Sequence, residues 1–290
     1  LHVCSRRQRQ MCIRDRLNIE KTIKYAENLI DKGCHGVVFF GSTGQSQLIS
    51  LSEKIQLINL LPKSNYRDKF IIGTGLNSLV DNINLIKIAK SNGFNKFLIM
   101  PPAYYKYSDH DVINFYTRII DEINECKIIL YNFEKLSGYK FSIDCVEELV
   151  KKFPSQIVGV KDSSYNLYEN LKIDNFSVMP GSESKLLKGL ELGCSGIITA
   201  TTNVTSILAR DVYDKFQNGS DQSSNEKLCL VRSIFDKFNL ISGLHTFMAQ
   251  IDHDYQNLIP PLKLLNENEK KIFFAELQKL DFDFKHLKAA

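Results

Sequence analysis

Hydrophobic and polar residues follow two alternating patterns along this chain from Leu17 onward. Short runs of consecutive apolar residues are separated by longer stretches in which apolar residues recur every three or four positions, as on one face of a helix. Because the short runs lack regular polar positions, they are typical of parallel strands that are covered on both faces. Strands are expected at residues 36–40, 70–73, 97–100, 127–131, 157–160, 176–179 and 196–200.

The stretches before and between these strands predict helices, and the alternation of strand and helix with short connections indicates βαβ units. A closed (β/α)8 TIM barrel is the expected fold, and its remaining strand should precede the first helix. An open doubly wound sheet is the alternative, although no Gly-x-Gly-x-x-Gly turn follows any strand. The predicted helices cover residues 18–32, 50–61, 79–91, 109–124, 142–153, 167–171 and 184–192.

Residues 1–16 differ in composition from the rest of the chain. They are rich in arginine, whereas the remainder prefers lysine, isoleucine and asparagine. We interpret residues 1–16 as a foreign or disordered basic segment; a basic arm that binds nucleic acid and a native amphipathic segment are the alternatives. The remaining barrel strand would fall within this segment, so the first strand is expected to be missing or replaced.

Residues 17–204 would then form the barrel, and residues 205–290 would form a helical C-terminal extension. This extension is too hydrophobic to be a linker, so it should pack on the barrel or form a subunit contact. Its helices are expected at residues 204–216, 225–238, 240–251 and 266–280.

Composition and charge narrow the choice of partners and compartment. A net charge of +4 is too weak to indicate a nucleic-acid partner, and the apolar runs are far shorter than a membrane span of about 20 residues. We see no signal peptide at the N-terminus. The seven cysteines include no Cys-x-x-Cys pair, which favours reduced thiols and the cytoplasm, and the scattered histidines predict no metal site.

Lys161 is the most informative candidate for chemistry, because it ends an apolar strand and active sites of parallel barrels lie at the carboxyl ends of the strands. A lysine whose pKa falls from about 10.4 toward about 7–8 on desolvation becomes a nucleophile. It can form an imine with a 2-keto acid, and the derived enamine attacks an aldehyde. An inward lysine that is merely paired with Asp162 or Glu183 is the structural alternative.

Two other segments also place polar groups at strand ends. Tyr131 can carry protons in the same site, although a core tyrosine is the alternative. Ser42 and Thr43 lie in a glycine-flanked turn whose hydroxyl and N–H groups can hold a carboxylate, although a plain turn is the alternative. The other polar residues expected at strand ends are Thr74, Asn77, Tyr104, Tyr105, Asn132, Asp162, Ser163, Ser182, Glu183, Thr201 and Asn203.

These motifs together resemble the dihydrodipicolinate synthase and N-acetylneuraminate lyase family. The resemblance rests on residues 41–44 (Gly-Ser-Thr-Gly), 131–138 (Tyr-Asn, then Leu-Ser-Gly) and 159–162 (Gly-Val-Lys-Asp), and it runs from about residue 17 to at least residue 203. It implies a barrel with a helical extension, a carbon–carbon lyase of the pyruvate-dependent class I aldolase type, and a homotetramer built as a dimer of dimers. It implies no cofactor besides the covalent imine between pyruvate and the enzyme.

The resemblance also assigns roles to individual residues. Lys161 would be the Schiff-base lysine and Tyr131 the proton shuttle, while Thr43 would join the relay and, with Ser42, hold the pyruvate carboxylate. Tyr105 resembles the tyrosine that is lent across a dimer interface. The expected substrate-binding residues are Ser42, Thr43, Gly44, Glu183 and Thr201.

Four positions depart from the family's pattern. The synthases carry an arginine for the carboxylate of aspartate semialdehyde where this chain has Leu136, as the sialic-acid lyases do. Those lyases carry an acidic pair after the seventh strand, where this chain has Ser182-Glu183. Glu134 replaces the usual proline, and Gln45 replaces the usual glutamate. The pyruvate half of the site therefore matches the family, while the aldehyde half matches neither type.

The expected function is a Schiff-base aldolase or lyase that joins or releases pyruvate and an aldehyde of the sugar-acid or semialdehyde type. The alternative is 4-hydroxy-tetrahydrodipicolinate synthase of lysine biosynthesis, against which the neutral Leu136 argues, because it cannot pair with a second carboxylate. An alternative of another class is a non-catalytic 2-keto acid binding protein or an inactive truncated copy.

Overall fold

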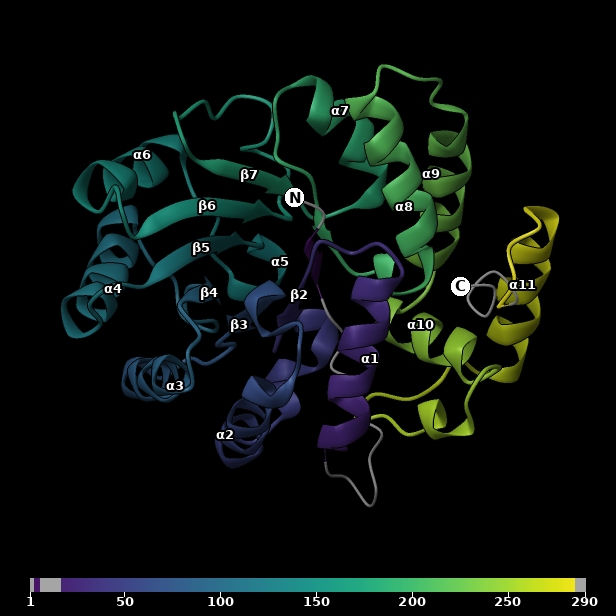
Figure 1. Cartoon of the computed structure of the whole chain (residues 1–290), viewed down its shortest axis with the longest axis horizontal. Coiled ribbons are helices and arrows are strands. Elements are labelled where there is room, and N and C mark those ends of the chain that lie inside the picture. Colours follow the sequence, from purple (N-terminus) through teal and green to yellow (C-terminus); the bar gives the residue numbers. More distant parts are fainter. Residues whose placement is uncertain (1–2, 6–16, 285–290) are drawn as a thin grey trace.

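A computed structural model describes residues 3–5 and 17–284, and these residues form a curled sheet of parallel strands surrounded by helices (Figure 1). Neighbouring strands pair in the order β7-β6-β5-β4-β3-β2-β1-β8. The N–H of Ser195, just before β8, donates to the carbonyl oxygen of Val178 in β7 at 3.0 Å, which closes the barrel. The strands are β1 (Val3–Ser5), β2 (Gly36–Phe39), β3 (Phe70–Gly73), β4 (Lys96–Ile99), β5 (Lys127–Asn132), β6 (Ile157–Asp162), β7 (Ser177–Pro180) and β8 (Ile198–Thr199).

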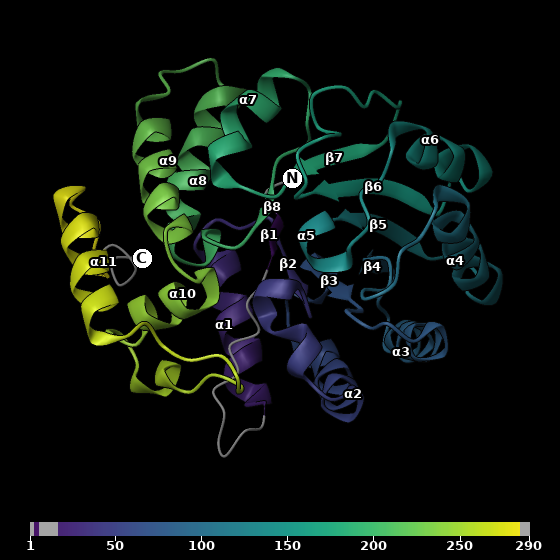
Figure 2. The ribbon, with the colours of Figure 1, turned by 180° about the vertical axis from the view of Figure 1, so that it is seen from behind.

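The strand that the sequence analysis expects to be missing or replaced is represented by β1. It is three residues long and pairs in parallel with both β2 and β8, so Cys4 lies opposite Val37 on one side and Thr199 on the other. Figure 2 shows β1 between these two strands. The barrel is therefore not open at this place. Residues 1–2 and 6–16, most of the segment interpreted as foreign, lie outside the described residues.

The helices form a ring around the strands, and α9, α10 and α11 gather at one side of it (Figures 1 and 2). Several begin at a capping side chain, whose oxygen accepts one of the first N–H groups of the helix. Examples are the hydroxyl of Ser50, and the hydroxyl of Ser108 together with the carboxylate of Asp111. The helices are α1 (Ile19–Asp31), α2 (Leu51–Leu60), α3 (Leu79–Ser91), α4 (Asp109–Glu122), α5 (Glu134–Ser137), α6 (Ile143–Lys152), α7 (Leu186–Glu191), α8 (Thr202–Gln217), α9 (Ser223–Asp236), α10 (Leu240–Met248) and α11 (Glu267–Lys279).

The short helix predicted at residues 167–171 is wrong, because this segment consists of turns. The reason lies in the buried carboxylate of Asp162. It accepts the backbone N–H groups of Tyr165, Leu167 and Tyr168 at 2.9–3.0 Å. A side chain that binds backbone donors in this way offers the chain an alternative to a helix.

Side chains from alternate positions of the strands fill the interior of the barrel. Val38, Ile71, Leu98, Ile129 and Ile198 form this inner cluster, together with Met179 and Tyr131. The interior is thus a packed core rather than a pore, as in other parallel barrels. Tyr131 brings a hydroxyl group to this otherwise apolar cluster, at the carboxyl end of β5.

The C-terminal extension has its own apolar core. Val231, Phe235, Phe247 and Phe273 are buried in it, and the rings of Phe235 and Phe273 meet edge to face at 5.0 Å. The domain boundary predicted after residue 204 falls inside α8, close to a non-helical residue at position 205. Among the described residues, no helix has both the length and the apolar character needed to cross a membrane.

A buried lysine in α2 leads to a prediction about stability. Lys54 is fully buried, and its Nζ donates to the carbonyl oxygens of Thr74 (2.9 Å) and Gly75 (3.4 Å). Burial lowers the pKa of Lys54 from 10.5 to about 8. Between about pH 8 and about pH 10.4, the unfolded chain therefore binds more protons than the folded one, so the free energy of unfolding rises with pH.

We expect Lys54→Met to lose this rise, which amounts to about 3 kcal/mol across the window. The measurement is the free energy of unfolding by urea for the wild type and the variant at pH 7 and pH 10. The free energy of unfolding of the wild type, relative to that of the variant, should be higher at pH 10 than at pH 7. Both carbonyl groups lose their donor in the variant at either pH, so that loss cancels. A difference between the proteins that does not change with pH would contradict the lowered pKa.

Candidate active site

Lys161 and Tyr131 face each other on neighbouring strands of the barrel. Their Cα positions are paired in the parallel register of β5 and β6. Both residues are buried, with 3% and 4% of their surfaces exposed, and the Lys161 Nζ lies 4.1 Å from the centroid of the Tyr131 ring. An amine and a phenol are thereby brought together at the carboxyl end of the strands, where the sequence analysis expects them.

The turn after β2 brings a second hydroxyl to this pair. Ser42 begins a short 3₁₀ helix (Ser42–Gly44), and its Oγ lies 2.8 Å from the hydroxyl oxygen of Tyr131. The hydrogen bond in the predicted relay is therefore made by Ser42, whereas Thr43 lies beside it in the same turn. Either hydroxyl can donate, so a proton can pass between the two side chains.

A buried hydrogen-bond network fixes the ends of β5 and β6. The amide of Asn132 donates to the carboxylate of Asp162 at 2.8 Å, and the Asn132 side-chain oxygen accepts from the N–H of Phe141 at 3.1 Å. Burial raises the pKa of Asp162, and the backbone donors after β6 act in the opposite direction. Because Asn132 and Asp162 directly follow Tyr131 and Lys161, this network positions the two reactive groups.

The pair opens into a cavity of about 520 Å³. Ser42, Thr43, Tyr131 and Lys161 lie in its wall. This volume suits a small-molecule site. The other lining residues come from the loops after the strands and from the C-terminal extension: Phe133, Glu134, Lys135, Ser163, Ser164, Tyr165, Gly181, Ala200, Arg232, Asp236, Phe238 and Leu240.

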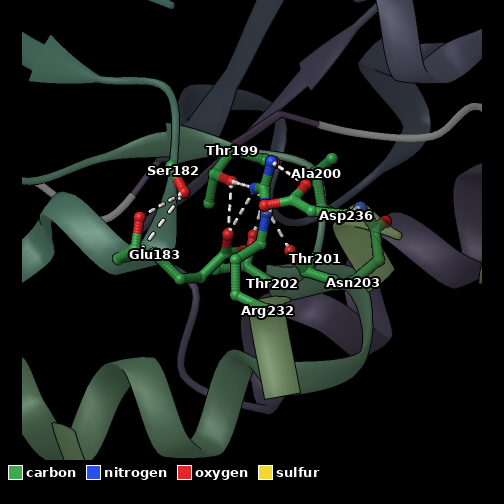
Figure 3. Close-up of polar contacts among 10 residues, drawn as sticks. Ser182, Glu183, Thr199, Ala200, Thr201, Thr202, Asn203, Arg232 and Asp236 are labelled. Carbon is green, nitrogen blue, oxygen red and sulfur yellow. Dashed lines mark hydrogen bonds and ion pairs between the residues drawn. The ribbon is translucent and has the colours of Figure 1, made fainter. Parts of the chain in front are cut away.

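Four of the predicted site residues lie outside the lining of this cavity in the described chain. The Gly44 N–H is used within the turn, where it donates to the Gly41 carbonyl oxygen at 2.8 Å. Glu183 and Thr201 are fully buried beside the guanidinium of Arg232, at 2.7 Å and 3.3 Å (Figure 3). Tyr105 is 68% exposed on the loop after β4.

Sequence reasoning missed Arg232 and Asp236, which reach the cavity from α9. A signal was present in the sequence, because Arg232 lies between Val231 and the pair Ile234-Phe235 on the apolar face of this helix. An arginine on a buried face needs partners. Asp236, four residues later, is a partner that helix spacing could have suggested. Glu183 and Thr199 come from segments far away in the sequence, so no local pattern could identify them.

Leu136 lies in a second, smaller pocket of about 150 Å³, which Tyr131 and Ser42 also line. Met100 and Ala103 line the same pocket. Leu136 is 45% exposed and belongs to the short helix α5. Next to the reactive groups, this side of the site therefore offers apolar surface where the synthases carry an arginine.

Gln45 ties the turn of Ser42 to the C-terminal extension. It is buried and adopts a left-handed backbone with φ of 54°. Its amide nitrogen lies 3.1 Å from Nε2 of His245, and its side-chain oxygen accepts the N–H of Ile259 at 3.1 Å. An amide suits this place because it can serve the ring nitrogen and the N–H at once.

The comparisons with known proteins agree with this geometry. The sequence profile of the Dihydrodipicolinate synthetase family matches residues 11–280. The chain belongs to this family. The predicted fold, and the predicted class of carbon–carbon lyase with class I aldolase chemistry, are thereby confirmed at the level of the family.

Individual members of the family are similar along most of their length. A 4-hydroxy-tetrahydrodipicolinate synthase of Methanopyrus kandleri is 28% identical over 274 residues, which cover 91% of this chain and 90% of that protein. The solved structure of a synthase of the same name from Methylacidiphilum fumariolicum SolV superposes with a TM-score of 0.88 at 21% identity, covering 99% of this chain and 97% of that one. YagE is a prophage protein of the family from E. coli K12, and its crystal structure was solved in complex with pyruvate. It superposes with a TM-score of 0.83 at 21% identity, covering 97% of this chain and 98% of that one.

Within the described residues there is no group of three or more His, Cys, Asp or Glu side chains that could hold a metal ion. The cavity offers the amine of Lys161, the hydroxyl groups of Tyr131 and Ser42 beside it, and further hydroxyl and charged groups in its wall. These groups are suited to covalent capture of a carbonyl compound and to proton transfer.

Proposed function

We propose that this protein is a pyruvate-dependent aldolase in which Lys161 forms the imine. The single observation that supports this best is the placement of the buried Lys161 Nζ over the ring of Tyr131, whose hydroxyl is bonded to Ser42. The pyruvate complex of YagE, a family member with the same fold, supports a 2-keto acid as the first substrate. Ser42 and Thr43 would hold its carboxylate through the hydroxyls and N–H groups of their turn.

The reaction begins at the amine of Lys161. Its Nζ attacks C2 of pyruvate, a carbon–nitrogen bond forms, and the ketone oxygen leaves as water after two proton transfers. The protonated imine then loses a proton from C3 and becomes an enamine. C3 of the enamine attacks the carbonyl carbon of the aldehyde, whose oxygen takes a proton, and water finally hydrolyses the imine and releases the amine.

Tyr131 would carry the protons in these steps. Its ring lies beside the Lys161 Nζ, and its hydroxyl can return a proton through Ser42. General acid–base groups of this kind contribute about 10²–10⁴-fold to a rate. In the reverse direction, the same groups release pyruvate and an aldehyde from a longer 2-keto acid.

A second candidate is 4-hydroxy-tetrahydrodipicolinate synthase, the name carried by relatives such as the one from Methanopyrus kandleri. Its aldehyde, aspartate semialdehyde, carries a carboxylate. Leu136 gives that carboxylate no partner beside Tyr131. The geometry therefore favours the broader aldolase over the synthase.

We expect Leu136→Arg to raise the turnover of aspartate semialdehyde with pyruvate by about tenfold or more, because a charge-assisted hydrogen bond replaces apolar surface. Leu136 is partly exposed, so the longer side chain has room. The measurement is kcat/KM for aspartate semialdehyde. Val80→Arg, on the exposed face of α3, is the matched control for added charge and should give no gain. Equal rates in Leu136→Arg and the wild type would weaken this reading of position 136.

A trapping experiment separates an aldolase from a protein that binds 2-keto acids without turnover. The protein is mixed with pyruvate, reduced with borohydride and digested, and the peptides are weighed by mass spectrometry. A covalent adduct on the peptide that contains Lys161 supports the aldolase. A folded protein that binds pyruvate without any such adduct would favour the non-catalytic alternative.

The assembly and location are further parts of the proposal. A dimer of dimers would place the exposed Tyr105 against a neighbouring subunit, where it could complete the relay of that subunit's Tyr131. The reduced state of Cys34, Cys126, Cys145, Cys194 and Cys229, which are free thiols, supports the cytoplasm.

A further inference from the structure

Arg232 and Asp236 form a fixed ion pair in the wall of the cavity (Figure 3). The Arg232 Nε lies 2.9 Å from both carboxylate oxygens of Asp236, and Nη2 lies 2.9 Å from one of them. On its other side, Nη1 donates to Glu183 at 2.7 Å and to Thr199 at 3.0 Å. A guanidinium with partners on both sides is held rigidly, and so is the carboxylate that it supports.

The two members of the pair differ in what they can offer to a ligand. Arg232 is 7% exposed and is already neutralised by Glu183 and Asp236, which raise its pKa although burial opposes this. A carboxylate of a substrate would have to displace one of them. The Asp236 side chain is 50% exposed, and its oxygens retain lone pairs that can accept hydrogen bonds from the cavity.

The surroundings of Asp236 are rich in hydroxyl groups. Ser163, Ser164 and Tyr165 follow β6 in the same cavity wall. Burial raises the pKa of Tyr165, so its hydroxyl keeps its proton at neutral pH. The basic groups of the wall and of its ion-pair partners exceed the acidic ones by one: Lys135, Lys140, Lys161 and Arg232 are basic, and Glu134, Asp236 and Glu183 are acidic.

Binding of pyruvate adds one negative charge, which offsets this excess. A second carboxylate would then enter a cavity with no excess positive charge and would meet Asp236 at its wall. Like charges in a partly desolvated site repel each other. A neutral molecule with hydroxyl groups would instead donate hydrogen bonds to the Asp236 oxygens, and the ion pair with Arg232 would stay in place.

We propose that Asp236 is a specificity-determining residue that selects an uncharged, hydroxylated aldehyde as the second substrate. This inference rests on the proposed function, because it concerns the aldehyde that the enamine attacks. The carboxylate accepts hydrogen bonds from hydroxyl groups of the aldehyde chain, and its charge disfavours aldehydes that carry a carboxylate. Arg232 is a positioning residue that holds Asp236 through both of its oxygens.

The experiment compares two probes, D-glyceraldehyde and succinic semialdehyde, with pyruvate as the first substrate. The wild type should prefer D-glyceraldehyde. Asp236→Asn should raise KM for D-glyceraldehyde about tenfold, since a charge-assisted hydrogen bond is lost, and should raise kcat/KM for succinic semialdehyde. KM for pyruvate and the borohydride adduct on Lys161 should stay unchanged.

Two further variants keep the test interpretable. Glu226→Gln removes the same charge from an exposed position on α9 and should change neither probe. Asp236→Glu keeps the charge but shifts it by one methylene, so it should retain the order of preference even where Asp236→Asn is poorly folded. Thermal unfolding of each variant reports on the fold.

The outcomes distinguish the inference from the function on which it rests. An adduct on Lys161 together with a wild-type preference for succinic semialdehyde would overturn the role of Asp236 alone. Unchanged kinetics of both probes in a folded Asp236→Asn would do the same. Absence of the adduct in the wild type would overturn the proposed function and this inference with it.

Discussion

Replacement of Lys161 by alanine is expected to abolish the joining of pyruvate to any aldehyde. The reaction needs a carbon–nitrogen bond to an uncharged amine. Among the described residues of the cavity wall, Lys135 is also a primary amine, but Lys161 is the one whose Nζ lies over the ring of Tyr131. Turnover should fall to the background measured without enzyme. The measurement is the rate of pyruvate consumption with a panel of aldehydes, taken with pyruvate in excess.

Lys161→Arg sharpens this prediction because it keeps a positive charge but removes the nucleophile. The guanidinium stays protonated at any working pH and forms no imine, so this variant should be as inactive as the alanine variant. Lys188→Ala removes an exposed lysine that is paired with Glu169, and it should behave as the wild type does. Substantial turnover by folded Lys161→Arg would mean that the lysine acts through its charge.

Replacement of Tyr131 by phenylalanine is the second large effect. The ring that packs in the barrel interior is kept, while the hydroxyl bonded to Ser42 is lost. We expect kcat to fall by about 10²–10⁴-fold, the usual contribution of a general acid–base group, while the imine still forms at a reduced rate. The measurement is kcat with saturating pyruvate, together with the yield of the borohydride adduct.

A matched variant separates the proton shuttle from a general loss of a hydroxyl group. Tyr168 is buried as Tyr131 is, but its hydroxyl donates to Glu169 and lies outside the cavity lining. Tyr168→Phe should keep the wild-type kcat. Ser42→Ala should lower kcat less than Tyr131→Phe does, because Tyr131 retains its own hydroxyl. Equal kcat in Tyr131→Phe and the wild type would remove Tyr131 from the mechanism.

Most of the barrel could be predicted from the sequence because its strands are continuous apolar runs, several of which have glycine or proline at an end. The segment after β6 could not, since the Asp162 carboxylate takes the backbone donors that a helix would have used. β1 also escaped prediction. Three residues are too few for a periodic pattern, and their place is defined by pairing with β2 and β8.

The grouping of the candidate amine and hydroxyl side chains at one end of the barrel was predictable for a related reason. Lys161, Tyr131 and Ser42 each follow a recognisable strand, and parallel strands bring their carboxyl ends to one edge. The wall formed by Arg232 and Asp236 was predictable only in part. Their spacing of four residues is that of an ion pair on a helix, but nothing in the sequence of α9 indicates that Arg232 also meets Glu183 or that the pair reaches this cavity. Glu183 shows the converse: its position after β7 suggested a ligand contact, whereas its carboxylate is bonded to Arg232.

Enamine formation at Lys161 and proton transfer by Tyr131 can both be tested in one measurement that requires no knowledge of the aldehyde. The protein is incubated with pyruvate in D2O, and the methyl signal of pyruvate is followed by proton NMR. The wild type should replace the methyl protons by deuterium, Tyr131→Phe should do so far more slowly, and Lys161→Arg only at the rate of buffer. Enamine formation at Lys161 would be contradicted if Lys161→Arg exchanged the methyl protons as fast as the wild type, or if the folded wild type exchanged none.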